Sequence, residues 1–318
     1  MLASSRLAST LLASVVAIAL AGCDNPGSAT AGLADGNHGK TRTLLTDAPF
    51  PFDRIARVDV YIVSISGSVA ADTSAGNTDF ATMATPNRRI NLLALQGGVT
   101  EELGAMTLPT GVITAIKMVI DTDSSSITLR DGRVLTGKTT PGIQWQSSAG
   151  RPTLNALIHE QIDVPSTGGV AVIDFDVGKA FIPVQELAPE STDSSFVFSP
   201  VLRAADANRT GAISGTVHAK TSGGAAVANA SLRLYFGIPS QPENTWSVMG
   251  TATTDATGAF KFAYATRSAW LASRGALLGG SYIVAVDPPS TSTLGRTLVK
   301  EVTVTAGQET KIGAVVLP

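Results

Sequence analysis

Two aspartates, Asp174 and Asp176, have the side-chain type and spacing that acid–base chemistry requires. They lie in residues 170–177, where apolar and polar residues alternate as in a β-strand. Alternate residues of a strand face the same side, so the two carboxylates would lie roughly 6 to 7 Å apart. Such a pair could act as acid and base in a hydrolase or share a cation. Paired aspartates on an exposed strand face are also common without either role.

Two other patterns resemble binding loops but break down at key positions. Residues 132–139 match G-x-x-x-x-G-K-T, the string that wraps backbone amides around phosphates at a helix start. Pro141 follows where that helix should run, and proline stops helices. Residues 121–125 begin like a calcium loop, but Ser126 stands where the loop needs glycine and Gly132 where it needs an acid. We expect neither nucleotide nor calcium binding.

The histidines and serines give no better candidate. His38, His159 and His218 are widely separated, and zinc ligands come in closely spaced sets. The sequence contains no G-x-S-x-G elbow for a serine nucleophile. We therefore predict no catalytic residues, no metal and no cofactor, and we expect the protein not to be an enzyme.

Three tryptophans offer a different kind of site. Trp145, Trp246 and Trp270 fall in or near predicted loops, where an exposed indole could stack on a sugar or a peptide. A tryptophan is also often partly exposed while it only closes the end of a β-sandwich. Indoles clustered on loops would favour ligand binding, and buried indoles would argue against it.

The only cysteine, Cys23, follows a pattern that favours export. Arg6 precedes an apolar run over residues 11–20, which Ala21 and Gly22 follow. A basic start, an apolar segment and a small-residue cleavage site make a secretory signal, and a cysteine directly after that site resembles the lipobox of bacterial lipoproteins. The resemblance implies removal of residues 1–22 and acylation of Cys23, for example with palmitate. Several acyl chains give stable membrane attachment.

This anchor predicts a location in the bacterial cell envelope and a spacer between the membrane and the folded part of the chain. Residues 23–42 are rich in Gly, Ala and Ser and are predicted to be a flexible tether after the lipidated cysteine. Asp24 weakly favours the inner membrane, so the choice between inner and outer membrane stays open. The alternatives are a short membrane helix or an ordinary signal, but the apolar run is shorter than the roughly 20 residues that span a bilayer.

Most of the remaining chain is predicted to be strand, which gives an all-β class. Runs rich in β-branched and aromatic residues occupy residues 58–65, 115–120, 170–177 and 196–199. Asp131 and Gly132 separate two alternating runs, which predicts a β-hairpin with a type I′ turn. Short helices are expected at residues 90–96, 101–105 and 267–278.

Residues 43–205 resemble the DUF4382 domain found in bacterial lipoproteins. The landmarks are LTDAP at residues 45–49, INLLAL at 90–95, LPTG at 108–111, VIDFD at 172–176 and FSPVLR at 198–203. That family has no assigned function, so the resemblance implies a β-rich domain and no mechanism.

Residues 210–318 resemble a carboxypeptidase regulatory-like domain, which is a seven-stranded transthyretin-like sandwich. The landmarks are ISGTV at residues 213–217, TDATGAFKF at 254–262 and GSYIVAV at 280–286. Phe260, Phe262, Tyr282, Val284 and Val286 alternate as one core face would. The resemblance implies a non-catalytic accessory module, and the chain is expected to be two tandem β-sandwich domains.

Composition narrows the partners. The net charge is −2 and charged residues make up only 15% of the chain, so no basic surface for nucleic acid is expected. Three function classes remain. The first is a non-catalytic envelope lipoprotein that binds or assembles with envelope proteins, the second a carbohydrate- or small-ligand-binding lipoprotein, and the third a hydrolase that uses Asp174 and Asp176.

Overall fold

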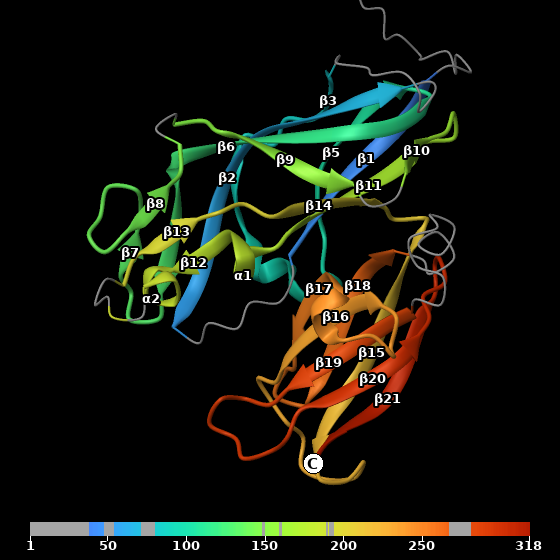
Figure 1. Ribbon diagram of the computed structural model, residues 1–318. Coiled ribbons are helices and arrows are strands. Elements are labelled where there is room, and N and C mark those ends of the chain that lie inside the picture. The colour runs from blue at the N-terminus through green and yellow to red at the C-terminus, as the bar shows by residue number, and fades with distance from the viewer. Residues whose placement is uncertain are drawn as a thin grey trace, which may run out of the picture. The chain divides into compact units, whose positions relative to one another are not determined.

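The computed structural model describes residues 38–47, 54–70, 80–147, 150–158, 161–188, 190, 194–266 and 281–318. Strands dominate these residues, so the predicted all-β class is confirmed. The strands form two sets along the chain, which we call the first β region (residues 38–206) and the second β region (residues 210–317). Figure 1 colours the first region blue to yellow and the second yellow-orange to red.

An 11-stranded sheet makes up most of the first β region. Its main path runs β3-β2-β6-β9-β14-β11-β1-β5, while β4 pairs with β2, and β7 and β10 pair with β6. The strands are β1 (His38–Thr46), β2 (Ile55–Ala70), β3 (Phe80–Ala84), β4 (Arg88–Asn91), β5 (Glu101–Pro109), β6 (Gly111–Leu129), β7 (Val134–Leu135), β9 (Thr153–Ile158), β10 (Ile162–Val164), β11 (Gly169–Phe175) and β14 (Leu202–Asp206).

This sheet curls so that its two end strands, β3 and β5, come close together. A Cβ placed on Gly104 of β5 would lie 3.2 Å from the Cβ of Ala84 of β3. An ion pair between Arg88 and Glu101 ties β4 to β5 near the same edge. The curled sheet encloses one apolar core, whose fully buried members include Leu45 and Phe175.

A second, three-stranded sheet completes the first region in the order β12-β13-β8. It consists of β8 (Ile143–Trp145), β12 (Phe181–Pro183) and β13 (Phe196–Phe198), and Phe181 and Phe198 belong to the same apolar core. The helical elements are short: the 3₁₀ helix η1 (Leu92–Gly98) and the one-turn helices α1 (Val177–Ala180) and α2 (Val184–Leu187).

The second β region is a sandwich of a three-stranded and a four-stranded sheet, seven described strands in all. One sheet runs β18-β15-β21 and the other β17-β16-β19-β20. Phe260 and Phe262 from one sheet and Tyr282, Val284 and Val286 from the other pack in one core, as their alternation predicted. The elements are β15 (Thr210–Ala219), β16 (Ser231–Gly237), η2 (Glu243–Thr245), β17 (Ser247–Thr253), β18 (Ala259–Thr266), β19 (Ser281–Asp287), β20 (Thr297–Val302) and β21 (Glu309–Leu317).

Two local predictions are wrong. Residues 101–105 form the start of β5, not a helix, because they pair with β1 and bury Leu103. The hairpin at Asp131 exists, but its loop has three residues: Leu129 pairs with Arg133, and Gly132 takes a φ of 88°. A glycine in that conformation completes a type I turn with a bulge, the usual three-residue loop.

The other helix predictions have different outcomes. Residues 90–96 overlap η1, which begins two residues later at Leu92. The helix expected at residues 267–278 lies outside the described residues. Within the described residues, no helix combines the length and hydropathy needed to cross a membrane.

Candidate functional site: an aspartate and arginine cluster

The ends of three neighbouring strands bring the predicted aspartates together with three further charged residues. Asp174 lies on β11 directly opposite Arg203 of β14, and opposite Thr46 on its other side, in β1. The Arg203 guanidinium contacts both predicted carboxylates, with its Nη1 3.4 Å from Asp174 Oδ2 and 3.1 Å from Asp176 Oδ2. Asp47, the residue after β1, completes what we call the aspartate cluster: Asp47, Asp174, Asp176, Lys179 and Arg203.

Asp176 ends the strand and starts a helical turn. β11 stops at Phe175, and the Asp176 carboxylate caps α1 by accepting a hydrogen bond from the Lys179 backbone N–H at 3.2 Å. Its other oxygen lies 3.5 Å from Lys179 Nζ and also contacts Arg203. An aspartate at this position satisfies a backbone donor that would otherwise lack a partner. Asp176 is therefore buried, with 1% of its surface exposed, and its oxygens are occupied by the fold.

Asp47, the residue that follows β1, connects this strand to the helical turn α1. Its Oδ1 accepts a hydrogen bond from the Val177 N–H at 3.0 Å, and Gln96 Nε2 lies 3.5 Å from its Oδ2. Its own N–H donates to the Leu95 carbonyl at 3.1 Å. One buried carboxyl thus connects β1, η1 and α1.

Burial changes the acidity of these groups. Burial raises the pKa of the Asp47 carboxyl well above its usual range, the Val177 N–H opposes this, and the charges of Asp174 and Asp176 add to it. Burial also raises the pKa of Asp174 to about 6, despite the opposing charge of Arg203. Burial lowers the pKa of Lys179, although Asp176 acts against that change. Asp174 Oδ1 is buried and has no hydrogen-bond partner among the described residues.

The arrangement limits the chemistry of the pair. A general base must reach a substrate proton with a free oxygen, yet Asp176 is enclosed and Asp47 holds a backbone N–H. Among the described residues, no group of three or more His, Cys, Asp and Glu side chains is arranged to hold a metal ion. The contacts instead hold three segments of the sheet together.

Sequence reasoning predicted Asp174 and Asp176 as a pair but did not assign a role to Asp47, Lys179 or Arg203. Asp47 and Arg203 lie inside the LTDAP and FSPVLR landmarks, and the two aspartates lie inside VIDFD. Three distant landmarks therefore meet in one cluster. All four of these residues lie inside family landmarks, and this was the one sequence feature that could have linked them. The order of the strands along the chain does not show that these landmarks are neighbours in the sheet.

The two described tryptophans are packed against other aromatic rings. Trp145 lies on β8, 4.7 Å from the Phe198 ring and 6.1 Å from the Phe181 ring between centroids. Trp246 follows η2, is 8% exposed, and donates from Nε1 to the Ile238 carbonyl at 2.9 Å. Rings held in this way present little face for stacking on a sugar. Trp270 lies outside the described residues.

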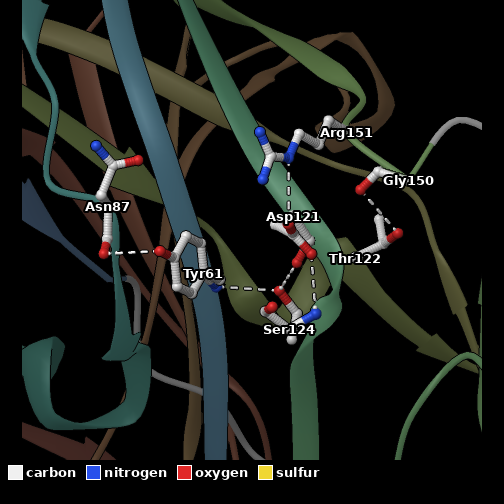
Figure 2. Close-up of polar contacts among 8 residues, drawn as sticks. Tyr61, Asn87, Asp121, Thr122, Ser124, Gly150 and Arg151 are labelled. Carbon is white, nitrogen blue, oxygen red and sulfur yellow. Dashed lines mark hydrogen bonds and ion pairs between the residues drawn. The ribbon is translucent and has the colours of Figure 1, made fainter.

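The calcium-like residues 121–125 form a wide bulge in β6. The register shifts from Asp59↔Ser126 to Tyr61↔Asp121, so four residues of β6 stand opposite Val60 of β2. Figure 2 shows Asp121 between Ser124 and Arg151, whose Nε is 3.2 Å from Asp121 Oδ2. Burial raises the pKa of Asp121, but the Ser124 N–H and Arg151 outweigh it and hold that pKa below its usual value. Both oxygens of the Asp121 carboxylate are thus occupied by contacts with Ser124 and Arg151.

Ser125 holds this bulge from inside, and its removal should weaken the fold. Its hydroxyl donates to the Asp121 carbonyl at 2.6 Å and accepts from the Tyr61 N–H at 3.0 Å, with 1% of the residue exposed. Ser125→Ala leaves both backbone groups unpaired, which should lower the free energy of unfolding by about 1–2 kcal/mol. Urea unfolding measures this, with Ser126→Ala as the neighbouring control. Equal losses in both variants would contradict the assignment.

Comparisons with known proteins identify one part of the chain. Residues 38–195 match the family model described as "Domain of unknown function (DUF4382)". This match covers β1, Asp47, Asp174 and Asp176, and it stops before Arg203. No curated protein matches the chain.

Solved structures show a weak likeness only. A 9R-lipoxygenase from Cyanothece PCC8801 is 12% identical over 35% of this chain and 17% of that chain, with a TM-score of 0.23. The Bacillus anthracis TIE protein is 9% identical over 88% of this chain and 34% of that chain, with a TM-score of 0.19. A double mutant of shaft pilin SpaA from Lactobacillus rhamnosus GG is 10% identical over 88% of this chain and 97% of that chain, with a TM-score of 0.22. The chain spans less than two thirds of the length of the lipoxygenase and of the TIE protein. TM-scores this low do not establish a shared fold.

Proposed function

Because residues 38–195 match the family model of the DUF4382 domain, we propose that this chain is a lipid-anchored bacterial envelope protein that acts by binding or assembly and not by catalysis. The occupied aspartate cluster is the observation that carries the non-catalytic part. Asp47 and Asp176 accept hydrogen bonds from backbone N–H groups, and Arg203 and Lys179 contact the remaining Asp176 oxygen. The carboxylates of Asp47 and Asp176 therefore hold neighbouring segments of the first β region together.

The second β region supports the same proposal. Its seven strands in two sheets agree with a transthyretin-like sandwich, and the carboxypeptidase regulatory-like family that its landmarks resemble is a non-catalytic accessory module. Two β domains, at residues 43–205 and 210–318, would then act through their surfaces. Envelope proteins or glycans are the partners of this proposal.

Membrane attachment is proposed from the sequence around Cys23. An apolar run over residues 11–20 and the Ala21-Gly22-Cys23 junction match what lipoprotein processing requires. Acyl chains contribute about 0.8 kcal/mol for each buried CH₂, so more than one chain is needed to hold a protein at a membrane. Residues 38–42, which were predicted as part of the tether, form the start of β1, so residues 23–37 would space the two β domains from the membrane surface.

Replacing Cys23 tests this anchor. Cys23→Ala should abolish incorporation of an alkyne-labelled palmitate and move the protein from the membrane fraction to the soluble fraction, because the acylated thiol is lost. Intact-mass measurement should show the loss of the acyl mass. Ser28→Ala, five residues further along, is the control and should keep both lipid and location. Unchanged acyl mass and fractionation in Cys23→Ala would refute the lipid anchor.

One observation favours the hydrolase as a second candidate function. Asp174 has a pKa raised to about 6 and a buried oxygen without a partner among the described residues, as an acid catalyst can have. Assay of the purified protein on nitrophenyl glycosides and esters separates the two proposals. Turnover that disappears in Asp174→Asn would favour the hydrolase, and no turnover above the Asp174→Asn background would favour the binding module.

A further inference from the structure

The four-stranded sheet of the second β region carries a small apolar cluster on its outer face. Residues of β16 and β19 that point into the main core alternate with residues that point the other way. The outward residues belong to a second buried cluster, separate from the main core: Tyr235, Trp246, Ile283 and Ala285, with Leu298 of β20 packed against them. The outer face of an antiparallel sheet commonly contacts water, so burial here requires a cover.

Residues 238–246, which we call the strap, provide that cover. They join β16 to β17, which are antiparallel neighbours in the sheet. The last strap residue, Trp246, lies over Gly237, because a Cβ on Gly237 would come within 2.2 Å of the Trp246 ring. The indole N–H donates to the Ile238 carbonyl at 2.9 Å. The two ends of the strap therefore meet, as in the compact Ω-loops that frequently have a function.

The strap reaches across β19 to the edge strand β20. In the sheet, β19 lies between β16 and β20. Lys300 of β20 nevertheless donates from Nζ to the Pro239 carbonyl at 3.0 Å. Arg296, which precedes β20, makes two hydrogen bonds of 2.6 and 2.7 Å to the Glu243 carboxylate. We call the Glu243–Arg296 pair the clasp. The strap thus crosses the outer face of the sheet over the apolar cluster.

Side chains, and not a backbone ladder, hold the strap in place. The N–H groups of Gln241, Thr245 and Trp246 donate to carbonyls three residues earlier, within the strap itself. In the part of the chain that the structure describes, no backbone hydrogen bond joins residues 238–246 to the sheet beneath them. The strap can therefore lift without breaking any strand pairing, and segments of this kind open at a lower free energy than core strands.

The clasp is the polar contact that ties the strap to the far side of the sheet. Its two side chains are each 34% exposed, and partly exposed ion pairs contribute little compared with core packing. Hydrogen bonding by Arg296 lowers the pKa of Glu243 to about 2, so the clasp stays charged at neutral and mildly acidic pH. Asp287 of β19 contacts Arg296 Nε at 2.8 Å and holds the guanidinium on the sheet side.

We propose that the strap opens as a unit about its two ends, and that the clasp keeps it closed over the apolar face of β16, β19 and β20. Opening uncovers Tyr235, Ile283 and Ala285, while the main core stays packed because it is a separate cluster. The strap goes beyond the proposed function, because it depends neither on the lipid at Cys23 nor on the absence of catalysis. Failure of one proposal therefore leaves the other standing.

Hydrogen exchange of the full chain tests the opening. In the wild type, the amides of residues 241–246 should exchange faster than those of β19, because they need only local opening. Glu243→Gln should speed strap exchange about tenfold, because a hydrogen bond to a charged group contributes more than one to a neutral group. Exchange in β19 should stay unchanged.

Asp287→Asn is the matched control for this variant. It removes a carboxylate from the same side-chain network, where Asp287 contacts Arg233 and Arg296 at 2.8 Å, but it leaves both partners of the clasp in place. It should change strap exchange by no more than about twofold. Circular dichroism spectra confirm that both variants are folded.

A thiol placed beneath the strap tests whether the apolar face is uncovered. Cys23 is the only cysteine, so Ala285→Cys in a Cys23→Ala chain carries a single thiol, at a position that is 0% exposed. Its reaction with dithiodipyridine under native conditions should become about tenfold faster when Glu243→Gln is added, as for strap exchange. Ala252→Cys, at a site in the main core with 2% exposure, is the control and should not respond.

Four results would overturn the proposal. The first is strap exchange as slow as that of β19 in the wild type, which would make the strap part of the cooperative core. The second is no acceleration in Glu243→Gln, or equal acceleration in Asp287→Asn, which would remove the role of the clasp. The third is faster strap exchange without faster labelling of Ala285→Cys, which would leave the apolar face covered. The fourth is equal acceleration of labelling in Ala252→Cys, which would indicate unfolding of the whole region.

Discussion

Arg203→Leu is expected to lower the free energy of unfolding by about 3–5 kcal/mol at neutral pH, because it removes the guanidinium that the buried Asp176 and the partly buried Asp174 share. The Arg203 side chain is 13% exposed and contacts both Asp174 and Asp176 within 3.4 Å. Leucine fills much of the space but cannot donate a hydrogen bond. Urea unfolding followed by circular dichroism measures the loss.

The matched control for this variant is an exposed ion pair. Arg57 contacts Asp59 at 2.7 Å with 55% of its side chain exposed, so Arg57→Leu should cost no more than about 1 kcal/mol. The loss in Arg203→Leu should shrink as pH falls below 6, because a protonated Asp174 no longer needs the cation. Similar losses in both variants at neutral pH would show that the aspartate cluster does not hold the sheet.

Asp174→Asn is expected to flatten the pH dependence of stability by about 3 kcal/mol between pH 4 and pH 7. The pKa of Asp174 rises on folding from 3.8 to about 6. In this window the folded protein holds more protons than the unfolded chain, so the free energy of unfolding falls as pH rises. The favourable contribution is complete below pH 3.8 and lost above about pH 6. Asparagine has no proton to lose, so the part of the slope that Asp174 contributes should disappear.

Unfolding curves at a series of pH values test this second prediction. Glu102→Gln serves as the control, because its carboxylate is 44% exposed and removal should change the slope little. Asp47 has a raised pKa as well, so a smaller slope of the same sign should persist in Asp174→Asn. A wild-type slope that survives unchanged in Asp174→Asn would disprove the assignment to Asp174.

The second β region was the most predictable part of the fold. Its core positions alternate strictly, and period-two burial is a local property that sequence displays directly. Phe260, Phe262 and Tyr282 could therefore be assigned to one core before any strand order was known, and all three are buried in it.

The aspartate cluster was predictable only in part. The spacing of Asp174 and Asp176 indicated a pair, but the end of the strand at Phe175 depends on how the following residues are held. Val177 N–H bonds to Asp47, a residue 130 positions away. No local pattern encodes a contact of that sequence separation, so the capping role of Asp176 could not be derived from its neighbours.

Segment 101–105 was missed for a similar reason. Its composition suits a helix, and helix propensity is a weak preference that tertiary pairing overrides. Pairing with β1 and burial of Leu103 decide its conformation as β5.

The position of β1 has a consequence for the order in which this chain can fold. β1 pairs in parallel with β11, so residues 41–46 need residues 169–174 before the sheet can close around them. Pairings of such high sequence separation slow folding. During synthesis, which proceeds from the N-terminus, β1 would lack its partner β11 until residues 169–174 have been made. Lys40 and Arg42 stand exposed along that strand, and charges at an open strand edge discourage pairing with another copy.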